Sequence, residues 1–262
     1  MERVTVHLLG RFAVDVDGRP LPDDAFAQRR AADLVKVLAL APGHRLSRDR
    51  VVEMLWPRLP ADAGTANLHK AAHYARRALG ARDAIVLRQG SVELAPSARV
   101  ETDAERFERD AEAPYGGELL PDDRYEDWAV GPRERLRDLR IQRLRAAGRW
   151  ADVVAEDPAD EQAHRELMQA DLAAGDRLAA ARRFRLLRDE LGRLGLRPSS
   201  ETLELERRLA EGPPVRAARA PGAPVVGRDA ELAHVVHALR GATEGDGAAL
   251  VVCADAGMGK TR

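Results

Sequence analysis

Cationic and hydrogen-bonding side chains recur at helical spacing between residues 62 and 79. At about 100° per residue, Lys70, His73 and Arg77 share one face of a helix. Asn67 and Tyr74 flank that face. Such side chains can bind phosphate oxygens and the acceptors on base edges in the major groove of DNA. The spacing therefore predicts a helix that presents this face to a nucleic acid, with a merely solvated charged face as the alternative.

The opposite face of the same predicted helix is apolar and mostly small, so it can pack closely against a neighbouring element. Its members are Leu68, Ala72, Ala75 and Leu79. Gly80 is expected to end the helix. His69 and His73 are four residues apart, which is compatible with zinc, but no acid lies between them and no third ligand is apparent. We therefore expect no metal site here and assign His73 to DNA contact.

A second stretch has the residue types of a phosphate-binding loop. Residues 254–261 read ADAGMGKT and follow a run typical of a buried strand, residues 248–252. The groups that would hold the phosphates and Mg²⁺ are Gly257, Gly259, Lys260 and Thr261. Ala254 replaces the first glycine of the motif, and only Arg262 follows where a helix would be needed. We therefore expect a vestigial nucleotide site and no cofactor in this chain, with ATP and Mg²⁺ bound only in a longer parent protein.

Two further helices are predicted before the cationic one. Apolar spacing that begins at Gln28 continues until Pro42 stops it. Ser47 is then expected to cap a second helix that ends at Trp56, and the third helix follows Asp62. Because an N-cap serine already has a structural role, we assign Ser47 to phosphate contact rather than to nucleophilic catalysis. We expect no catalytic residue and no enzymatic activity.

Predicted β-structure lies on both sides of these helices. Runs rich in β-forming residues at 4–9 and 12–16 indicate an N-terminal antiparallel sheet. Residues 84–95 predict a hairpin with its turn at Gly90. The tip of this hairpin would place Arg88 against a minor groove or the adjacent DNA backbone.

Charge is divided unevenly along the chain, although its net value is −1. Residues 28–90 contain twelve Lys and Arg against five Asp and Glu, whereas residues 101–212 contain twenty against twenty-seven. This asymmetry favours a nucleic-acid partner for the first segment and protein contacts for the second. The sequence has a single cysteine, no signal peptide and no apolar run near the roughly 18 residues of a membrane span. We expect a cytoplasmic protein without a membrane partner.

Strands, three helices with a basic third, and a hairpin follow the order of a winged helix. Residues 1–98 resemble the OmpR-type winged-helix domain of the Streptomyces antibiotic regulatory protein family. The matching stretches are QRR at 28–30, LSRDRVV at 46–52 and LWP at 55–57. Residues 99–212 resemble that family's bacterial transcriptional activation domain. The matching stretches there are VETD at 100–103, RFE at 106–108, GGELL at 116–120 and Trp128.

The resemblance implies a transcriptional activator that binds double-stranded DNA at direct repeats as a homodimer and recruits RNA polymerase. Ser47 and Arg48 would then contact phosphates, and residues 57–62 are a candidate polymerase contact. The regulated genes would belong to a secondary-metabolite cluster, such as one for an antibiotic. Residues 213–224 are interpreted as a linker, and residues 225–262 as the truncated start of a signal-transduction ATPase domain.

The acidic segment is predicted to be a helical array even without the resemblance. Apolar spacing predicts a helix over residues 132–147. Three polar residues are expected to begin later helices, namely Asp160, Asp176 and Ser199. Residues 172–184 match the helix-turn-helix seam of a tetratricopeptide repeat. The segments between Phe107 and Gly116 and at residues 148–158 are shorter than in the family, so we expect an incomplete array.

The expected fold is therefore mainly α with a small antiparallel β component. A winged helix-turn-helix is followed by a tetratricopeptide-like helical repeat domain. Two other classes of function stay open: a nucleotide-gated signalling ATPase fragment, and a helical-repeat interaction scaffold with a winged helix that does not bind DNA. ATP binding would favour the first, and absence of DNA binding would favour the second.

Overall fold

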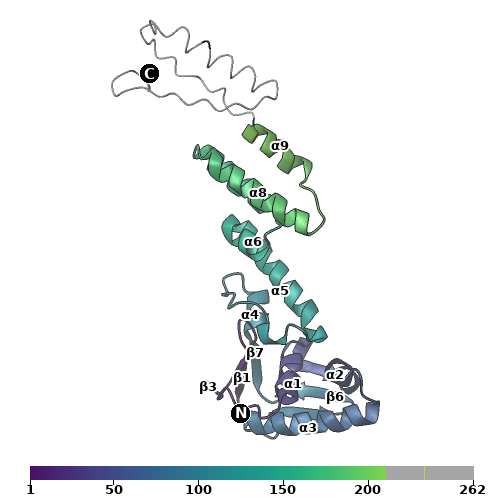
Figure 1. The fold of residues 1–262 in the computed structure, drawn as a ribbon. Coiled ribbons are helices and arrows are strands. Elements are labelled where there is room, and N and C mark those ends of the chain that lie inside the picture. Colours follow the sequence, from purple (N-terminus) through teal and green to yellow (C-terminus); the bar gives the residue numbers. More distant parts are fainter. Residues whose placement is uncertain (211–232, 234–262) are drawn as a thin grey trace, which may run out of the picture. The chain divides into compact units, whose positions relative to one another are not determined.

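The computed structural model describes residues 1–210 and residue 233 (Figure 1). The predicted linker and the loop residues Gly257, Gly259, Lys260 and Thr261 lie outside the described residues. Within residues 1–209, which form one unit, most residues are helical and two small sheets are present. The predicted fold class is confirmed. Among the described helices, none combines the length and apolarity that a membrane crossing requires.

The first sheet has four strands in the order β3-β2-β1-β7. Its strands are β1 (Arg3–His7), β2 (Ala13–Val16), β3 (Arg19–Pro20) and β7 (Arg99–Thr102). The first three are antiparallel, as predicted, and Asp17-Gly18 forms the turn between β2 and β3 with positive φ angles of 50° and 78°. β7 pairs with β1 in parallel. The sequence did not predict this pairing, because residues distant in sequence form it.

Three helices follow the first hairpin. They are α1 (Arg29–Ala39), α2 (Arg48–Leu55) and α3 (Ala61–Leu79). A 3₁₀ turn, η1 (Pro42–His44), follows α1, where the sequence predicted the helix to stop. The Ser47 hydroxyl accepts a hydrogen bond from the amide of Arg50 at 3.2 Å, which is the predicted N-cap of α2. Gly80 adopts a left-handed conformation, with φ of 73°, and ends α3.

The second sheet contains the predicted hairpin and one strand that the sequence did not predict. Its strands, in the order β4-β6-β5, are β4 (Arg45–Ser47), β6 (Ser91–Leu94) and β5 (Ile85–Arg88). β4 is only three residues long and immediately precedes the cap of α2. It is too short to show a period of two in the sequence, so only its pairing with β6 reveals it.

The second half of residues 1–210 is helical. Its elements are α4 (Asp103–Arg109), η2 (Pro121–Asp123), α5 (Asp127–Ala146), α6 (Trp150–Glu156), α7 (Glu161–Ala173), α8 (Arg177–Arg193) and α9 (Ser200–Ala210). Asp160 and Asp176 cap α7 and α8, as predicted, and accept amide hydrogen bonds of 2.9 and 2.8 Å. Ala180 and Phe184 are buried where α7 and α8 pack together, at the predicted repeat seam.

The prediction that the first long helix begins at Pro132 is wrong, because α5 begins at Asp127. Pro132 lies inside the helix, where it lacks the amide that would bond to the carbonyl of Trp128. Trp128 and Ala129 are buried in the main hydrophobic core and stabilise the turn before the proline. Tertiary packing therefore extends the helix past a residue that normally marks a boundary.

A buried ion cluster joins α1 to η2. The Lys36 ammonium lies 2.7 Å from an Asp123 carboxylate oxygen and 3.5 Å from one of Asp33. The three side chains are 8%, 4% and 0% exposed. Burial raises the pKa of Asp33 above its usual value, although the nearby Lys36 and Arg30 charges oppose this shift. Buried ion pairs thus hold α1 to the start of the helical array.

The end of β1 contacts the segment that leads to η2. Leu9 and Leu119 form an isolated antiparallel bridge, and the Gly10 amide donates to the Glu118 carbonyl at 2.8 Å. Gly10 has a φ of 81°, and a β-carbon on it would lie 2.5 Å from the carbonyl oxygen of Gly116. Only glycine fits both this conformation and this contact.

Gly10→Ala should therefore destabilise the protein more than Gly18→Ala. Gly18 also has a positive φ, of 78°, but no atom lies within 4 Å of a β-carbon placed there. The control should cost about 1–2 kcal/mol for backbone strain alone, and Gly10→Ala about 1–3 kcal/mol more because of the clash. Urea unfolding of both variants measures the difference. Equal losses would mean that the contact with Gly116 is not tight.

Lys36→Met should lower the free energy of unfolding by about 3–5 kcal/mol at neutral pH, because it removes the buried ammonium that lies between two buried carboxylates and leaves them only the more exposed Arg29 and Arg30 at the rim. The loss should shrink as the pH falls, since protonation removes the charge of Asp33, whose pKa is already raised. Arg50→Met is the control, because Arg50 pairs at 2.8 Å with an exposed Glu53 and should contribute less than about 1 kcal/mol. A loss independent of pH would contradict this account.

Candidate nucleic-acid interface

The two faces of α3 differ as the sequence predicted. Leu68, Ala72, Ala75 and Leu79 are buried, together with Gly64 and Ala71, against α1 and α2. Lys70, His73 and Arg77 are exposed, and Asn67 and Tyr74 are half-buried at the border of this face. Whether these residues contact DNA stays a prediction.

The exposed donors of α3 are available to a ligand. Within residues 1–210, the side chains of Lys70, His73 and Arg77 make no ion pair and no hydrogen bond. The His73 ring packs edge-on against Tyr74 with 5.5 Å between ring centroids, which restrains the orientation of both rings. Since a helix rises about 1.5 Å per residue, residues 70–77 span about 10 Å, or about three base steps of one DNA strand.

Close packing between α2 and α3 fixes the direction of the exposed face. A β-carbon on Gly64 would lie 2.3 Å from a methyl carbon of Val52, so the two helices approach where α3 has no side chain. Arg76 adds a second restraint: its Nε donates to the carbonyl of Ile85 in β5 at 2.8 Å. Arg76 was not among the residues predicted from the sequence, because only the fold shows that this neighbour of Arg77 turns towards the wing.

The second sheet brings Ser47 and Arg88 close together. Ser47 and Arg88 are each paired with Ser91, from β4 and β5 on opposite sides of β6. Neighbouring strands lie about 4.8 Å apart, so the backbones at the two residues are about 10 Å apart. Both side chains are exposed, and within the described residues Arg88 has no ion pair. A hollow of about 390 Å³ lies at this edge, around Ser47 and Gly90.

Two amides at the N-terminus of α2 are already engaged. The Arg48 amide donates to the Gly90 carbonyl at 2.7 Å, and the Arg50 amide donates to Ser47. Arg48 is half-buried, and its Nε is buried without a hydrogen-bond partner among the described residues. A phosphate at this position would therefore meet the Ser47 hydroxyl and the end of the Arg48 guanidinium rather than a full set of free amides.

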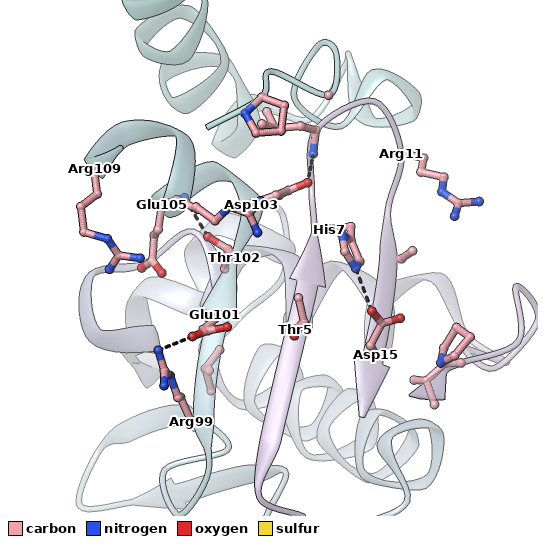
Figure 2. Close-up of a pocket in the computed structure, with 18 of the residues that line it drawn as sticks. Thr5, His7, Arg11, Asp15, Arg99, Glu101, Thr102, Asp103, Glu105 and Arg109 are labelled. Carbon is pink, nitrogen blue, oxygen red and sulfur yellow. Dashed lines mark hydrogen bonds and ion pairs between the residues drawn. The ribbon is translucent and has the colours of Figure 1, made fainter. Parts of the chain in front are cut away.

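A hollow of about 650 Å³ lies over the outer face of the first sheet (Figure 2). His7 and Asp15 cross its floor with a 3.0 Å contact, and Arg99 pairs with Glu101 at 2.6 Å. Arginines and carboxylates alternate around it, so it favours neither an anion nor a cation. Among the described residues, no group of three or more His, Cys, Asp or Glu could hold a metal ion, and His69 has no third ligand there.

Comparison with known proteins finds one matching domain family and a similar fold. Residues 82–210 match the model of the bacterial transcriptional activator domain family. The structure of Mycobacterium tuberculosis EmbR in complex with a low-affinity phosphopeptide is similar in fold, with a TM-score of 0.58 and 18% identity over 92% of this chain and 72% of that one. No curated protein matches the sequence.

The activator-domain match begins at residue 82, between α3 and the first strand of the wing, so the predicted boundary between residues 98 and 99 stays a prediction. Residues 82–210, just under half of the chain, thus match a bacterial transcriptional activator domain, and the fold of the chain is similar to that of EmbR.

Proposed function

We propose that the chain binds double-stranded DNA with sequence specificity and activates transcription from the bound site. The observation that carries the proposal is the exposed face of α3. Lys70, His73 and Arg77 are exposed there without partners among the described residues, while the other face is buried. An unpaired cationic face on a rigidly packed helix suits a polyanionic ligand with acceptors at fixed spacing.

In this proposal α3 enters the major groove. Lys70 and Arg77 would point into this groove, with His73 between them along the helix. An arginine there can bond a guanine through two acceptors. Asn67 and Tyr74 would contact bases or backbone at the border of the same face. Ser47 and Arg48 would hold one phosphate, and Arg88 would reach the adjacent backbone or minor groove from the wing.

The remaining partners follow from the family. Two copies would bind a direct-repeat operator and recruit RNA polymerase, with the loop before α3 as the polymerase contact. Leu59 in this loop is 42% exposed, which gives a partner protein an apolar side chain to cover. The regulated genes would form a secondary-metabolite cluster. We propose that this unit acts in the cytoplasm without a cofactor or catalytic residue.

Selection of genomic DNA fragments by the purified protein tests the proposal directly. A recurring sequence motif with repeated half-sites would support it. Binding that depends only on salt, with no enriched motif, would leave a non-specific basic surface and contradict sequence recognition. Failure to retain any DNA would favour the scaffold function instead.

Arg77→Ala should weaken binding to the selected operator by about 1–3 kcal/mol if Arg77 reads a base, with a smaller effect on unrelated DNA. If it contacts a phosphate, affinity should fall on all sequences alike, and the slope of log K against log salt should fall by about 1. Arg197→Ala is the control, because Arg197 is exposed between α8 and α9 and away from α3. Unchanged affinity on both kinds of DNA would exclude Arg77 from the interface.

A further inference from the structure

Two helices of the activator domain carry exposed stripes of opposite charge, each with exposed apolar side chains. The acidic stripe runs along the start of α5 and consists of Tyr125, Asp127, Val130, Glu134 and Asp138. The basic stripe runs along α8 and consists of Leu178, Arg182, Arg185 and Leu186. From these stripes we infer that α5 of one copy of the chain docks on α8 of a second copy, head to tail.

The acidic stripe is a continuous surface. Asp127, Val130, Glu134 and Asp138 follow helical spacing on one face of α5, and Tyr125 lies just before the helix. Tyr125 is 98% exposed and Val130 is 40% exposed. Within residues 1–210, the three carboxylates of this stripe make no ion pair. A tyrosine this exposed, beside unpaired acids, is typical of a side chain that a partner covers.

The basic stripe is somewhat shorter than the acidic stripe and opposite to it in charge. Residues 178, 182, 185 and 186 share one face of α8, because they are spaced by four, seven and eight residues, and the stripe ends before the exposed Asp189, which pairs with Arg188 at 3.7 Å. Leu178 is 59% exposed and Leu186 is 66% exposed. Neither Arg182 nor Arg185 forms an ion pair with any described residue. At about 1.5 Å per residue, this stripe spans about 12 Å and the helical part of the acidic stripe about 16 Å.

The acidic and basic stripes do not form ion pairs with each other within the described part of one chain. α5 packs on α4 and α6, whereas α8 packs on α7, and these contacts leave both stripes exposed. Exposed leucines beside the arginines favour a protein partner over nucleic acid, whose backbone offers no apolar surface to cover them. Every copy of the chain carries a surface of the required opposite charge, so a second copy is the partner whose chemistry the structure already contains.

The contact has a direction, because it joins two different surfaces. A two-fold dimer would bury the same patch on both copies, whereas α5 against α8 relates successive copies in the same orientation along a line. This polarity matches a direct repeat, in which the two half-sites also point the same way. The inference thus deepens the proposed function on DNA, while the self-association itself can be measured without DNA.

Paired charge reversals test the contact. The acid-reversed variant carries Glu134→Arg and Asp138→Arg, and the base-reversed variant carries Arg182→Glu and Arg185→Glu. Like charges then face each other between identical copies, so sedimentation velocity at low salt should show at least about tenfold weaker self-association for each variant than for the unmodified chain. An equimolar mixture of the two variants should associate again, and so should a single chain that carries all four changes.

Matched controls separate this contact from general charge effects. Glu112→Arg and Arg197→Glu reverse exposed charges outside both stripes and should leave association unchanged. Tyr125→Ala should weaken association at high as well as low salt, because its contribution is apolar. Circular dichroism of each variant checks that the helices remain folded.

DNA with one or two selected half-sites gives the second readout. The unmodified chain should bind the second site about tenfold more tightly once the first is filled. Each reversed variant should lose this cooperativity but keep its single-site affinity. Loss of single-site binding would instead count against the proposed DNA contact. Three outcomes would overturn the inference: an unmodified chain that neither self-associates nor binds cooperatively, reversals without effect, or a mixture that does not recover association.

Discussion

An ammonium group buried between two carboxylates determines how the DNA-facing helices meet the helical array. Removing Lys36, Asp33 and Asp123 from water has a large desolvation cost, and only close mutual contact offsets it. The relative position of α1 and η2 is therefore narrowly defined. Because α3 packs on α1, the exposed face of α3 is oriented with respect to the activator domain through the same charges. An apolar contact of equal area would tolerate sliding far better.

The rim of this cluster shows why several arginines here are poor candidates for ligand contact. Arg29 lies 2.9 Å from Glu126, and Arg30 lies 3.4 Å from the same carboxylate, so both are engaged in holding the two parts together. Lys70 and Arg77, by contrast, have no partner among the described residues. In an arginine-rich chain, the number of arginines does not show which of them bind a ligand. The presence or absence of an ion pair separates arginines that stabilise the fold from those that are free to bind.

Local signals in the sequence were sufficient for much of the fold. The N-cap at Ser47, the left-handed Gly80 and the buried face of α3 each depend on residues within a turn or two of each other, and the structure confirms them. Features that depend on distant residues were missed or wrong. β4 and β7 exist only through their partners, Arg76 acts through a carbonyl of β5, and Pro132 is accommodated because Trp128 is buried. The exposed donors of α3 were predicted as a stripe, but their freedom from ion pairs required coordinates.

The parallel pairing of β1 with β7 has a consequence for how the protein is made and divided. β1 is an inner strand of the first sheet, yet its neighbour β7 follows in the sequence only after all three helices and the wing. Asp103, next to β7, also accepts hydrogen bonds from the amides of Leu8 and Leu9 at 2.8 and 3.1 Å. A winged helix cut before β7 would expose the edge of β1 and leave the amides of Leu8 and Leu9 without their hydrogen-bond acceptor. A chimera that exchanges the two parts of this chain should therefore carry β7 and the start of α4 along with β1.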